Sequence, residues 1–164
     1  MNNKKVIIGG TFDILHNGHK ALLERAFALG RVSIGLVSDA MAKRIKKRKV
    51  ADFKERKKEL KRFIKKNFKA EANIFKIKDK FGPTLEESFD FIVVSPETRQ
   101  TALKINKKRL ELGKKPIKII KIDFVLTEGK KPISSTKIAK GEIDREGESL
   151  KEKTRILKNI KTFG

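Results

Sequence analysis

Short apolar segments alternate with segments of helical periodicity along this chain, and that alternation limits the available folds more than any other feature. Five segments resemble buried strands: residues 6–9, 32–37, 72–77, 91–94 and 117–125. Helical spacing predicts helices at residues 18–29, 39–45, 52–67, 98–112, 134–140 and 148–160. Because the connections are short, we predict an α/β, Rossmann-like fold with a parallel sheet and helices on both faces, formed by residues 1–164 as a single domain.

Two of the predicted helices have features that depend on individual residues. Asp39 is predicted to cap the helix at residues 39–45. In the helix at residues 52–67 and just beyond it, the apolar residues share one stripe: Phe53, Leu60, Ile64 and Phe68. The many lysines of that helix are therefore predicted to form a solvated outer face.

The charge balance is strongly basic, with 42 Lys and Arg against 20 Asp and Glu, a net charge of +22. Such a field attracts nucleic acids, acidic membrane surfaces and nucleotide substrates. The basic residues are spread along the chain, which is equally consistent with a composition typical of heat-adapted proteins. The sequence has no Tyr or Trp and no groove-reading motif, so we expect no specific nucleic-acid partner.

Other classes of protein are excluded by what the sequence lacks. No apolar run approaches the roughly 20 residues that a membrane span needs, so we expect no membrane partner. The first residues lack the apolar core of a signal peptide. The absence of cysteine rules out disulfides, thiolate metal sites and a cysteine nucleophile. The expected compartment is the cytoplasm, and a homo-oligomer is left open.

The segments that follow the predicted strands have related compositions. In parallel sheets covered on both faces, ligands bind beyond the carboxyl ends of the strands, where the strand order reverses. The segments there are rich in glycine, hydroxyl or basic residues: residues 9–19, 38–43, 95–99 and 127–136. This convergence predicts one active site at that edge of the sheet.

The loop after the first strand, GGTFDILHNGH, has the composition of an anion site, although it matches no P-loop and no G-x-G-x-x-G motif. The pair Gly9 and Gly10 lets backbone N–H groups approach an anion closely, and Thr11 adds a hydroxyl. His16 and His19 are the only histidines of the chain, and their spacing at the start of a helix lets both rings face one point. These residues favour the stabilisation of a reacting phosphate.

Structural alternatives exist for the same residues. The two histidines could bind a metal ion with Asp13 as the third ligand, although no other ligand cluster is present. The paired glycines could form only a turn, and His16 could be a satisfied core residue. Gly18 could serve only close packing between helix and strand.

Asn106 is a further candidate outside the loops. It lies between Leu103 and Leu110, on what is predicted to be the buried stripe of its helix. An unpaired amide there costs about 1–3 kcal/mol. The side chain therefore either pairs with neighbouring backbone or faces the nucleotide, and we favour the nucleotide.

Two motifs carry a family resemblance. GGTFDILHNGH resembles the G-T-F-D-x-x-H-x-G-H signature of the nucleotidyltransferase superfamily, which is related to class I aminoacyl-tRNA synthetases. ISSTKI, from Ile133 to Ile138, resembles the second signature, I-S-S-T-[RK]-I. Both occur in the right order and at the right separation, so the chain is identified as a member of that superfamily. This implies the nucleotidyltransferase fold.

Four further segments resemble archaeal phosphopantetheine adenylyltransferases: VSIGLVSDAMAKR (32–44), FKERKKEL (53–60), VVSPET (93–98) and GEIDREG (141–147). The resemblance covers nearly the whole chain and is least distinctive around residues 65–80. It implies transfer of AMP from ATP to 4'-phosphopantetheine, which gives dephospho-coenzyme A and pyrophosphate by direct in-line attack. The alternative is another small-molecule nucleotidyltransferase, such as an FAD synthetase or a glycerol-3-phosphate cytidylyltransferase, and the SPET and GEIDREG segments argue against it.

The resemblance also implies roles for individual residues. His19 would contact the α-phosphate in the transition state, and His16 the nucleotide phosphates. Thr11 and Lys43 would position the acceptor phosphate. Ser134, Ser135 and Thr136 would hold the β- and γ-phosphates, with a plain helix cap as the alternative.

The partners implied are ATP, which brings Mg²⁺ with it, and 4'-phosphopantetheine; no protein-held metal is expected. The predicted nucleotide-binding residues are Gly9, Gly10, Phe12, Gly18, Ser95, Glu97, Thr98, Asn106, Ser134, Ser135 and Thr136. Bacterial relatives carry an arginine-rich segment where this chain has SPETRQ, and Arg99 is a candidate substitute for those arginines.

Overall fold

The computed structural model describes residues 3–123, 125–126, 133–141 and 145. The described residues form two compact units: the first contains residues 3–13 and 22–123, and the second contains residues 14–21, 125–126, 133–141 and 145. The predicted helix at residues 148–160 lies outside the described residues. A single domain stays a prediction.

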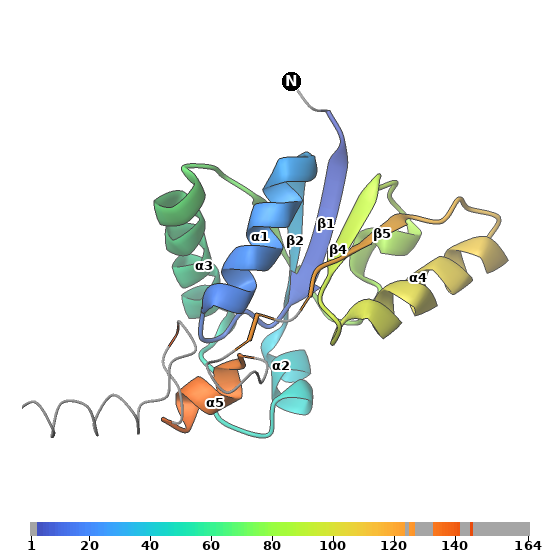
Figure 1. Ribbon diagram of the computed structural model, residues 1–164. Coiled ribbons are helices and arrows are strands. Elements are labelled where there is room, and N and C mark those ends of the chain that lie inside the picture. The colour runs from blue at the N-terminus through green and yellow to red at the C-terminus, as the bar shows by residue number, and fades with distance from the viewer. Residues whose placement is uncertain (1–2, 124, 127–132, 142–144, 146–164) are drawn as a thin grey trace, which may run out of the picture. The chain divides into compact units, whose positions relative to one another are not determined.

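The first unit contains a five-stranded parallel sheet (Figure 1). Its strands are β1 (Lys5–Gly10), β2 (Arg31–Val37), β3 (Asn73–Ile77), β4 (Phe91–Val94) and β5 (Lys118–Lys121). Their order is β3-β2-β1-β4-β5, and every neighbouring pair is parallel. The α/β fold class predicted from the alternation of segments is therefore confirmed.

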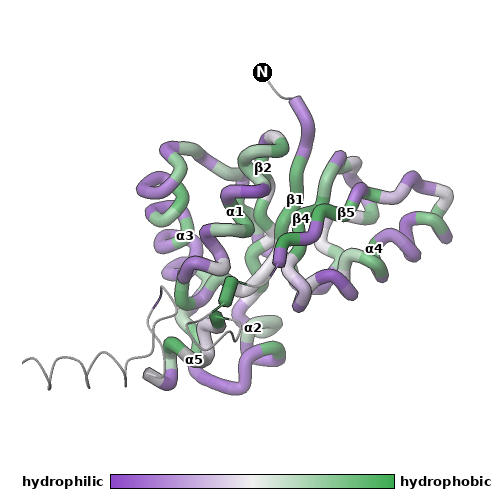
Figure 2. The backbone as a smooth tube through the Cα atoms, in the orientation of Figure 1, coloured by the Kyte–Doolittle hydropathy of each residue, from purple (hydrophilic) through white to green (hydrophobic). Residues whose placement is uncertain are grey.

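Both faces of the central strand β1 are buried. Ile7 belongs to a core cluster with Ala102 and Ile105 from the helix that follows β4. Val6 and Ile8 point to the opposite face, because side chains alternate along a strand, and both are 0% exposed. Figure 2 accordingly shows hydrophobic residues concentrated in β1 and β4. A strand covered on both faces is apolar at every position, which is the pattern seen in the sequence.

The helices lie close to the predicted ranges. They are α1 (Asn17–Leu29), α2 (Asp39–Ile45), α3 (Phe53–Phe68), α4 (Arg99–Glu111) and α5 (Ser135–Ala139). Parallel crossovers are right-handed, so reversal of the strand order at β1 directs the connections of the two halves of the sheet to opposite faces. No helix among the described residues is both long enough and apolar enough to cross a membrane.

Three details differ from the predictions. The N-cap of α2 is Ser38, whose Oγ accepts a hydrogen bond from the Met41 N–H, and Asp39 is the first helical residue. Strand β5 is shorter than predicted, because only residues 118–121 pair with β4. A short 3₁₀ helix, η1 (Gly82–Leu85), was not predicted; proline near its start fixes the backbone for such a turn.

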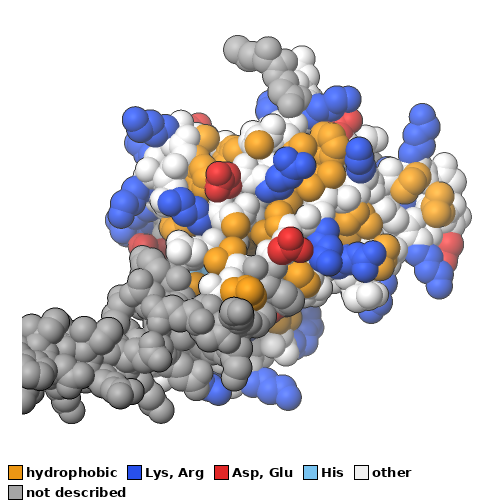
Figure 3. All heavy atoms as spheres, in the orientation of Figure 1, with side chains coloured by type: hydrophobic (Ala, Val, Ile, Leu, Met, Phe, Trp, Pro, Cys, Tyr) orange, Lys and Arg blue, Asp and Glu red, His pale blue; other side chains and the backbone are white. Residues whose placement is uncertain are grey.

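Helix α3 follows its predicted amphipathic pattern with one exception. Asp52 caps it by accepting a hydrogen bond from the Glu55 N–H at 2.9 Å, and Leu60 and Ile64 are buried. Arg56, however, is also buried on this strongly charged helix. Elsewhere the charge is dispersed: Figure 3 shows Lys and Arg side chains spread over the visible face, with uncharged side chains between them.

Candidate active site

The first unit brings three predicted site segments to one edge of its sheet. Residues 9–13 comprise the end of β1 and the loop after it, residues 38–43 follow β2 and residues 95–99 follow β4. All three strands are parallel, so their carboxyl ends share an edge. The strand order reverses between β1 and β4, where α/β sheets bind their ligands. The predicted placement of these three segments at one edge of the sheet is confirmed, and an active site at that edge stays a prediction.

The loop after β1 is shaped by a contact between Gly10 and Phe12. A Cβ atom on Gly10 would lie 3.0 Å from the Phe12 ring, so glycine lets the ring pack against the strand end. Phe12 has a φ of 47° and is 2% exposed. Left-handed backbone at a non-glycine residue is typical of functional loops. The Phe12 side chain thus serves the packing of the loop, and a nucleotide contact stays a prediction only for its backbone.

Asp13, the third ligand in the metal alternative, pairs with a cation. Its carboxylate forms an ion pair with the guanidinium of Arg48, and its side chain is only 6% exposed. The other carboxylate oxygen accepts a hydrogen bond from the Ala51 N–H at 3.4 Å. Asp13 therefore ties the β1 loop to the segment between α2 and α3. Among the residues that the structure describes, no three His, Cys, Asp or Glu side chains form a group that could hold a metal ion.

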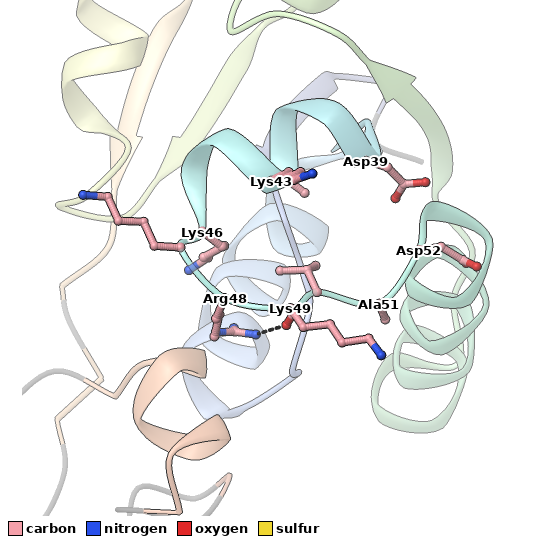
Figure 4. A pocket seen from close by; sticks show the side chains of 10 residues that line it. Asp39, Lys43, Lys46, Arg48, Lys49, Ala51 and Asp52 are labelled. Atoms are coloured by element: carbon pink, nitrogen blue, oxygen red, sulfur yellow. Dashed lines mark hydrogen bonds between the residues drawn. The ribbon is translucent and has the colours of Figure 1, made fainter.

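Lys43 lines a basic pocket at the carboxyl end of β2. The pocket has a volume of about 580 Å³ and is formed by α2 and the loop that leads into α3 (Figure 4). Its lining residues are Asp39, Ala42, Lys43, Lys46, Lys47, Arg48, Lys49, Val50, Ala51 and Asp52. Within the loop, the Arg48 Nη1 also donates to the Lys49 carbonyl at 3.2 Å. Five cations against two carboxylates make this pocket suitable for an anionic group.

The segment after β4 is a compact turn. The Ser95 N–H donates to the Thr98 Oγ1 at 3.1 Å, and the two hydroxyl oxygens lie 3.4 Å apart. The Thr98 and Arg99 N–H groups both donate to the Ser95 carbonyl. Glu97 and Arg99 are exposed at the same edge. Nucleotide binding by Ser95, Glu97 and Thr98 stays a prediction.

The prediction that Asn106 faces the nucleotide is wrong. Its Nδ2 donates to the Ile117 carbonyl and its Oδ1 accepts from the Ile117 N–H, both at 2.8 Å. The amide therefore fastens α4 to the segment that leads into β5, which is the structural alternative. The predicted buried stripe was also misplaced, because Leu103 is 40% exposed and Leu110 is 62% exposed. The buried residues of α4 are Ala102, Ile105 and Arg109.

The second unit holds the two histidines at the start of α1. Their ring centroids lie 3.9 Å apart. The His16 Nδ1 accepts a hydrogen bond from the Gly18 N–H at 3.0 Å, and the His19 Nδ1 accepts one from the His16 N–H at 3.2 Å. A ring nitrogen that accepts carries no proton, so both rings are neutral and their protons reside on Nε2. The arrangement makes the two Nε2–H groups the hydrogen-bond donors of this site.

Gly18 is the point where the two sequence motifs meet. A Cβ atom on Gly18 would lie 2.7 Å from the His16 ring and 3.2 Å from the Ile133 side chain. Ile133 directly precedes Ser134, Ser135 and Thr136, of which Ser135 is buried and begins α5. Gly18 therefore packs closely against a histidine ring and the second motif and not against a strand, so the explanation by packing between helix and strand is not supported. A nucleotide contact for Gly18 stays a prediction.

The segment GEIDREG, which resembles the archaeal enzymes, also has a residue in the second unit. The Asn17 N–H at the start of α1 donates to the carbonyl of Arg145 at 3.0 Å. Arg145 lies in the segment GEIDREG. This unit thus brings together the HxGH residues, the ISSTKI segment and Arg145 of the GEIDREG segment.

Two arginines that contact the loop after β1 were not singled out by sequence reasoning. Arg56 hydrogen-bonds the Thr11 carbonyl at 3.1 Å, and Arg48 pairs with Asp13. A signal existed for Arg56, because it lies three residues after Phe53 and four before Leu60, on the apolar stripe of its helix. Nothing in the sequence distinguishes Arg48 from the neighbouring Lys residues at positions 46, 47 and 49.

Comparisons with known proteins agree with this geometry. The family model described as Cytidylyltransferase-like matches residues 7–141. A curated phosphopantetheine adenylyltransferase of Archaeoglobus fulgidus is 49% identical over 145 residues, which cover 87% of this chain and 97% of that protein. A phosphopantetheine adenylyltransferase of Methanosarcina mazei is 48% identical over 153 residues, covering 90% of this chain and 98% of the relative.

A solved structure shows the same fold. A crystal structure of a protein with unknown function from Archaeoglobus fulgidus superposes with a TM-score of 0.70 at 45% identity, covering 74% of this chain and 99% of that one. Its strong likeness in both sequence and structure agrees with the family model. The chain belongs to the cytidylyltransferase-like family and, within it, groups with the archaeal phosphopantetheine adenylyltransferases.

Proposed function

We propose that this protein is a phosphopantetheine adenylyltransferase, which transfers AMP from ATP to 4'-phosphopantetheine and releases dephospho-coenzyme A and pyrophosphate. The observation that carries the proposal is the packing of both nucleotidyltransferase motifs around Gly18, where His16 and Ile133 are neighbours. Relatives that are 49% and 48% identical over nearly their whole length bear the same name. The cytoplasm is the proposed compartment.

The chemistry requires alignment and charge stabilisation. A phosphate oxygen of the acceptor forms a bond to the α-phosphorus of ATP, while the bond from that phosphorus to the bridging oxygen breaks. Pyrophosphate leaves with the electron pair of the broken bond. Because the attacking oxygen is already anionic, no general base is needed, and the site must hold two anions in line.

The histidines supply hydrogen-bond donors to this reaction. Their Nδ1 atoms accept backbone N–H groups, so neither ring can use that nitrogen as a donor. We assign the Nε2–H of His19 to the α-phosphate, where negative charge develops in the transition state. His16 is assigned to the nucleotide phosphates beside it, since the two rings are neighbours.

The acceptor phosphate is assigned to the first unit. Thr11 ends the β1 loop, and Lys43 lies on α2 beside the basic pocket. Both follow strands whose carboxyl ends share one edge of the sheet. A hydroxyl donor and a mobile ammonium can together position a phosphate and balance its charge as the new bond forms.

The nucleotide tail is assigned to Ser134, Ser135 and Thr136. These hydroxyl residues lie at the start of α5, directly after the Ile133 that packs against Gly18. Mg²⁺ would come with ATP as its counter-ion and would lower the charge of the leaving pyrophosphate.

One assay tests the proposal. The protein is incubated with MgATP and either 4'-phosphopantetheine or flavin mononucleotide, and separately with CTP and glycerol 3-phosphate. Pyrophosphate release and the mass of the product are followed. We expect pyrophosphate and dephospho-coenzyme A only with 4'-phosphopantetheine. Turnover with flavin mononucleotide or glycerol 3-phosphate alone would overturn the proposal in favour of the corresponding transferase.

A further inference from the structure

Arg56 is a fully buried cation on the most highly charged helix. It is 1% exposed and shares its face of α3 with Leu60 and Ile64. Removal of a guanidinium from water is costly unless its N–H groups find partners. The hydrogen-bond partners of Arg56 therefore indicate which contacts offset the cost of burying its guanidinium.

The guanidinium binds three segments that are separate in the sequence. Its Nε donates to the Ala51 carbonyl at 2.8 Å, and its Nη1 donates to the Thr11 carbonyl at 3.1 Å. Its Nη2 donates to the Asp39 Oδ1 at 3.0 Å. Because the guanidinium is planar and rigid, the three partners are fixed relative to one another.

Each partner belongs to the acceptor side of the proposed site. Thr11 is itself assigned to the acceptor phosphate. Asp39 is the first residue of α2, and Lys43 follows it one helical turn later. Ala51 lines the basic pocket, and Figure 4 shows Asp39, Lys43 and Ala51 around it. The Arg56 contacts therefore join Thr11 directly to the first residue of the helix that carries Lys43.

A second hydrogen bond of Ala51 also links its loop to the loop after β1. The Ala51 N–H donates to Asp13, whose carboxylate pairs with Arg48. Both polar backbone groups of Ala51 are thus engaged, one by Arg56 and one by Asp13. The loop at residues 46–52 is held to the β1 loop from both sides.

We propose that Arg56 is a positioning residue for the acceptor phosphate. It fixes Thr11 and the start of α2 in place, so that Thr11 and Lys43 can bind the same phosphate. This inference rests on the proposed function, because that function assigns Thr11 and Lys43 to the acceptor. It predicts that the loss of Arg56 affects 4'-phosphopantetheine and leaves ATP binding intact.

The test variant is Arg56→Lys. It keeps the positive charge and the apolar part of the side chain but loses the planar guanidinium, whose N–H groups bind three partners at once. We expect kcat/KM for 4'-phosphopantetheine to fall about 10- to 100-fold, the scale of a small misplacement of reacting groups. The dissociation constant of ATP, measured by calorimetry, should stay within about threefold. Equal losses for both substrates, or no loss for either, would overturn the proposal.

Arg109→Lys is the matched control. Arg109 is 5% exposed and likewise binds carbonyls, those of Thr84, Glu87 and Lys115, but none of these belongs to the acceptor segments. We expect Arg109→Lys to lower the melting temperature and to leave KM for 4'-phosphopantetheine unchanged. The same loss of acceptor affinity in this control would show that Arg56 has only a general structural role.

Asp39→Ala decides the question if Arg56→Lys fails to fold. The Asp39 side chain is 60% exposed, so its removal leaves no cavity in the core. We expect a rise in KM for 4'-phosphopantetheine of about 3- to 10-fold, with ATP binding retained. An unchanged KM would overturn the role of Arg56. A wild-type protein that makes no dephospho-coenzyme A would instead overturn the proposed function, so the two failures are distinguishable.

Discussion

The Nδ1 atom of His19 accepts a hydrogen bond from the backbone N–H of His16 at 3.2 Å, so the position of one histidine orients the ring of the other. The rings are 3.9 Å apart at their centroids. This arrangement fixes the tautomer and the direction of the Nε2–H of His19 before any substrate binds. Preorganised donors of this kind stabilise developing charge most effectively.

Replacement of His19 by Ala should lower kcat by about 10²–10³, the scale for the loss of one preorganised donor. ATP binding should change less, because the donor acts mainly on the transition state. Steady-state kinetics and ATP titration measure the two effects. A change in kcat within about threefold would contradict the assigned role.

Two amide substitutions provide a matched pair for that prediction. In His19→Gln the side-chain amide nitrogen can occupy the place of Nε2, whereas in His19→Asn it can reach only the place of Nδ1. The Gln variant should therefore retain more activity than the Asn variant. The reverse order would indicate that the Nδ1 side of the ring carries the catalytic function.

Thr11→Ala and Thr136→Ala should affect the binding of different substrates. Thr11→Ala removes a donor to the acceptor, so it should lower turnover and weaken 4'-phosphopantetheine binding more than ATP binding. Thr136→Ala should weaken ATP binding by about 1.5–3 kcal/mol, the value for hydrogen bonds to charged groups. Titration of each variant with each substrate measures both effects. Equal losses of both substrates in both variants would show that the two substrates are not divided between these residues in this way.

Asn106→Ala should destabilise the protein without affecting its substrates. The substitution removes two hydrogen bonds to the Ile117 backbone, which should cost about 1–3 kcal/mol in the free energy of unfolding. KM for ATP should remain within about twofold. Denaturant unfolding and steady-state kinetics separate the two effects. A selective rise in KM for ATP at unchanged stability would restore the nucleotide-binding assignment.

Binding to duplex DNA should be weak despite the net charge of +22. The basic side chains are spread over the face seen in Figure 3, so few can contact phosphates together. The affinity should fall steeply with salt, as counterion release requires. Fluorescence anisotropy over a salt series measures this. Submicromolar, sequence-selective binding at about 150 mM salt would contradict the prediction.

The strands and most helices could be predicted because local signals specify them. Apolar runs such as residues 91–94 are the pattern of strands buried on both faces, and Asp52 is a strong helix cap. The two nucleotidyltransferase motifs identified the family for the same reason, since their residues are close in the sequence. The contact between the motifs at Gly18 joins distant segments and needed the structure.

The errors concern buried polar side chains. Arg56 and Arg109 both occupy apolar helix stripes, where their stems pack and their guanidinium groups bind backbone oxygens. Hydropathy treats both as surface residues, so Arg56 was not recognised as part of the buried stripe of α3, and the stripe of α4 was placed at Leu103 and Leu110. Asn106 was misassigned because its partner, Ile117, is identified only by the fold.

The central position of β1 has a consequence for synthesis of the chain. Val6 pairs with Val32 on one side and with Phe91 on the other. Since the N-terminal part emerges first, β1, β2 and β3 can pair before residues 91–94 have been translated. Until then one side of β1 presents unpaired N–H and C=O groups, which readily recruit another chain. The nascent protein therefore exposes this edge of β1 during the interval, and a translational pause there would lengthen the exposure.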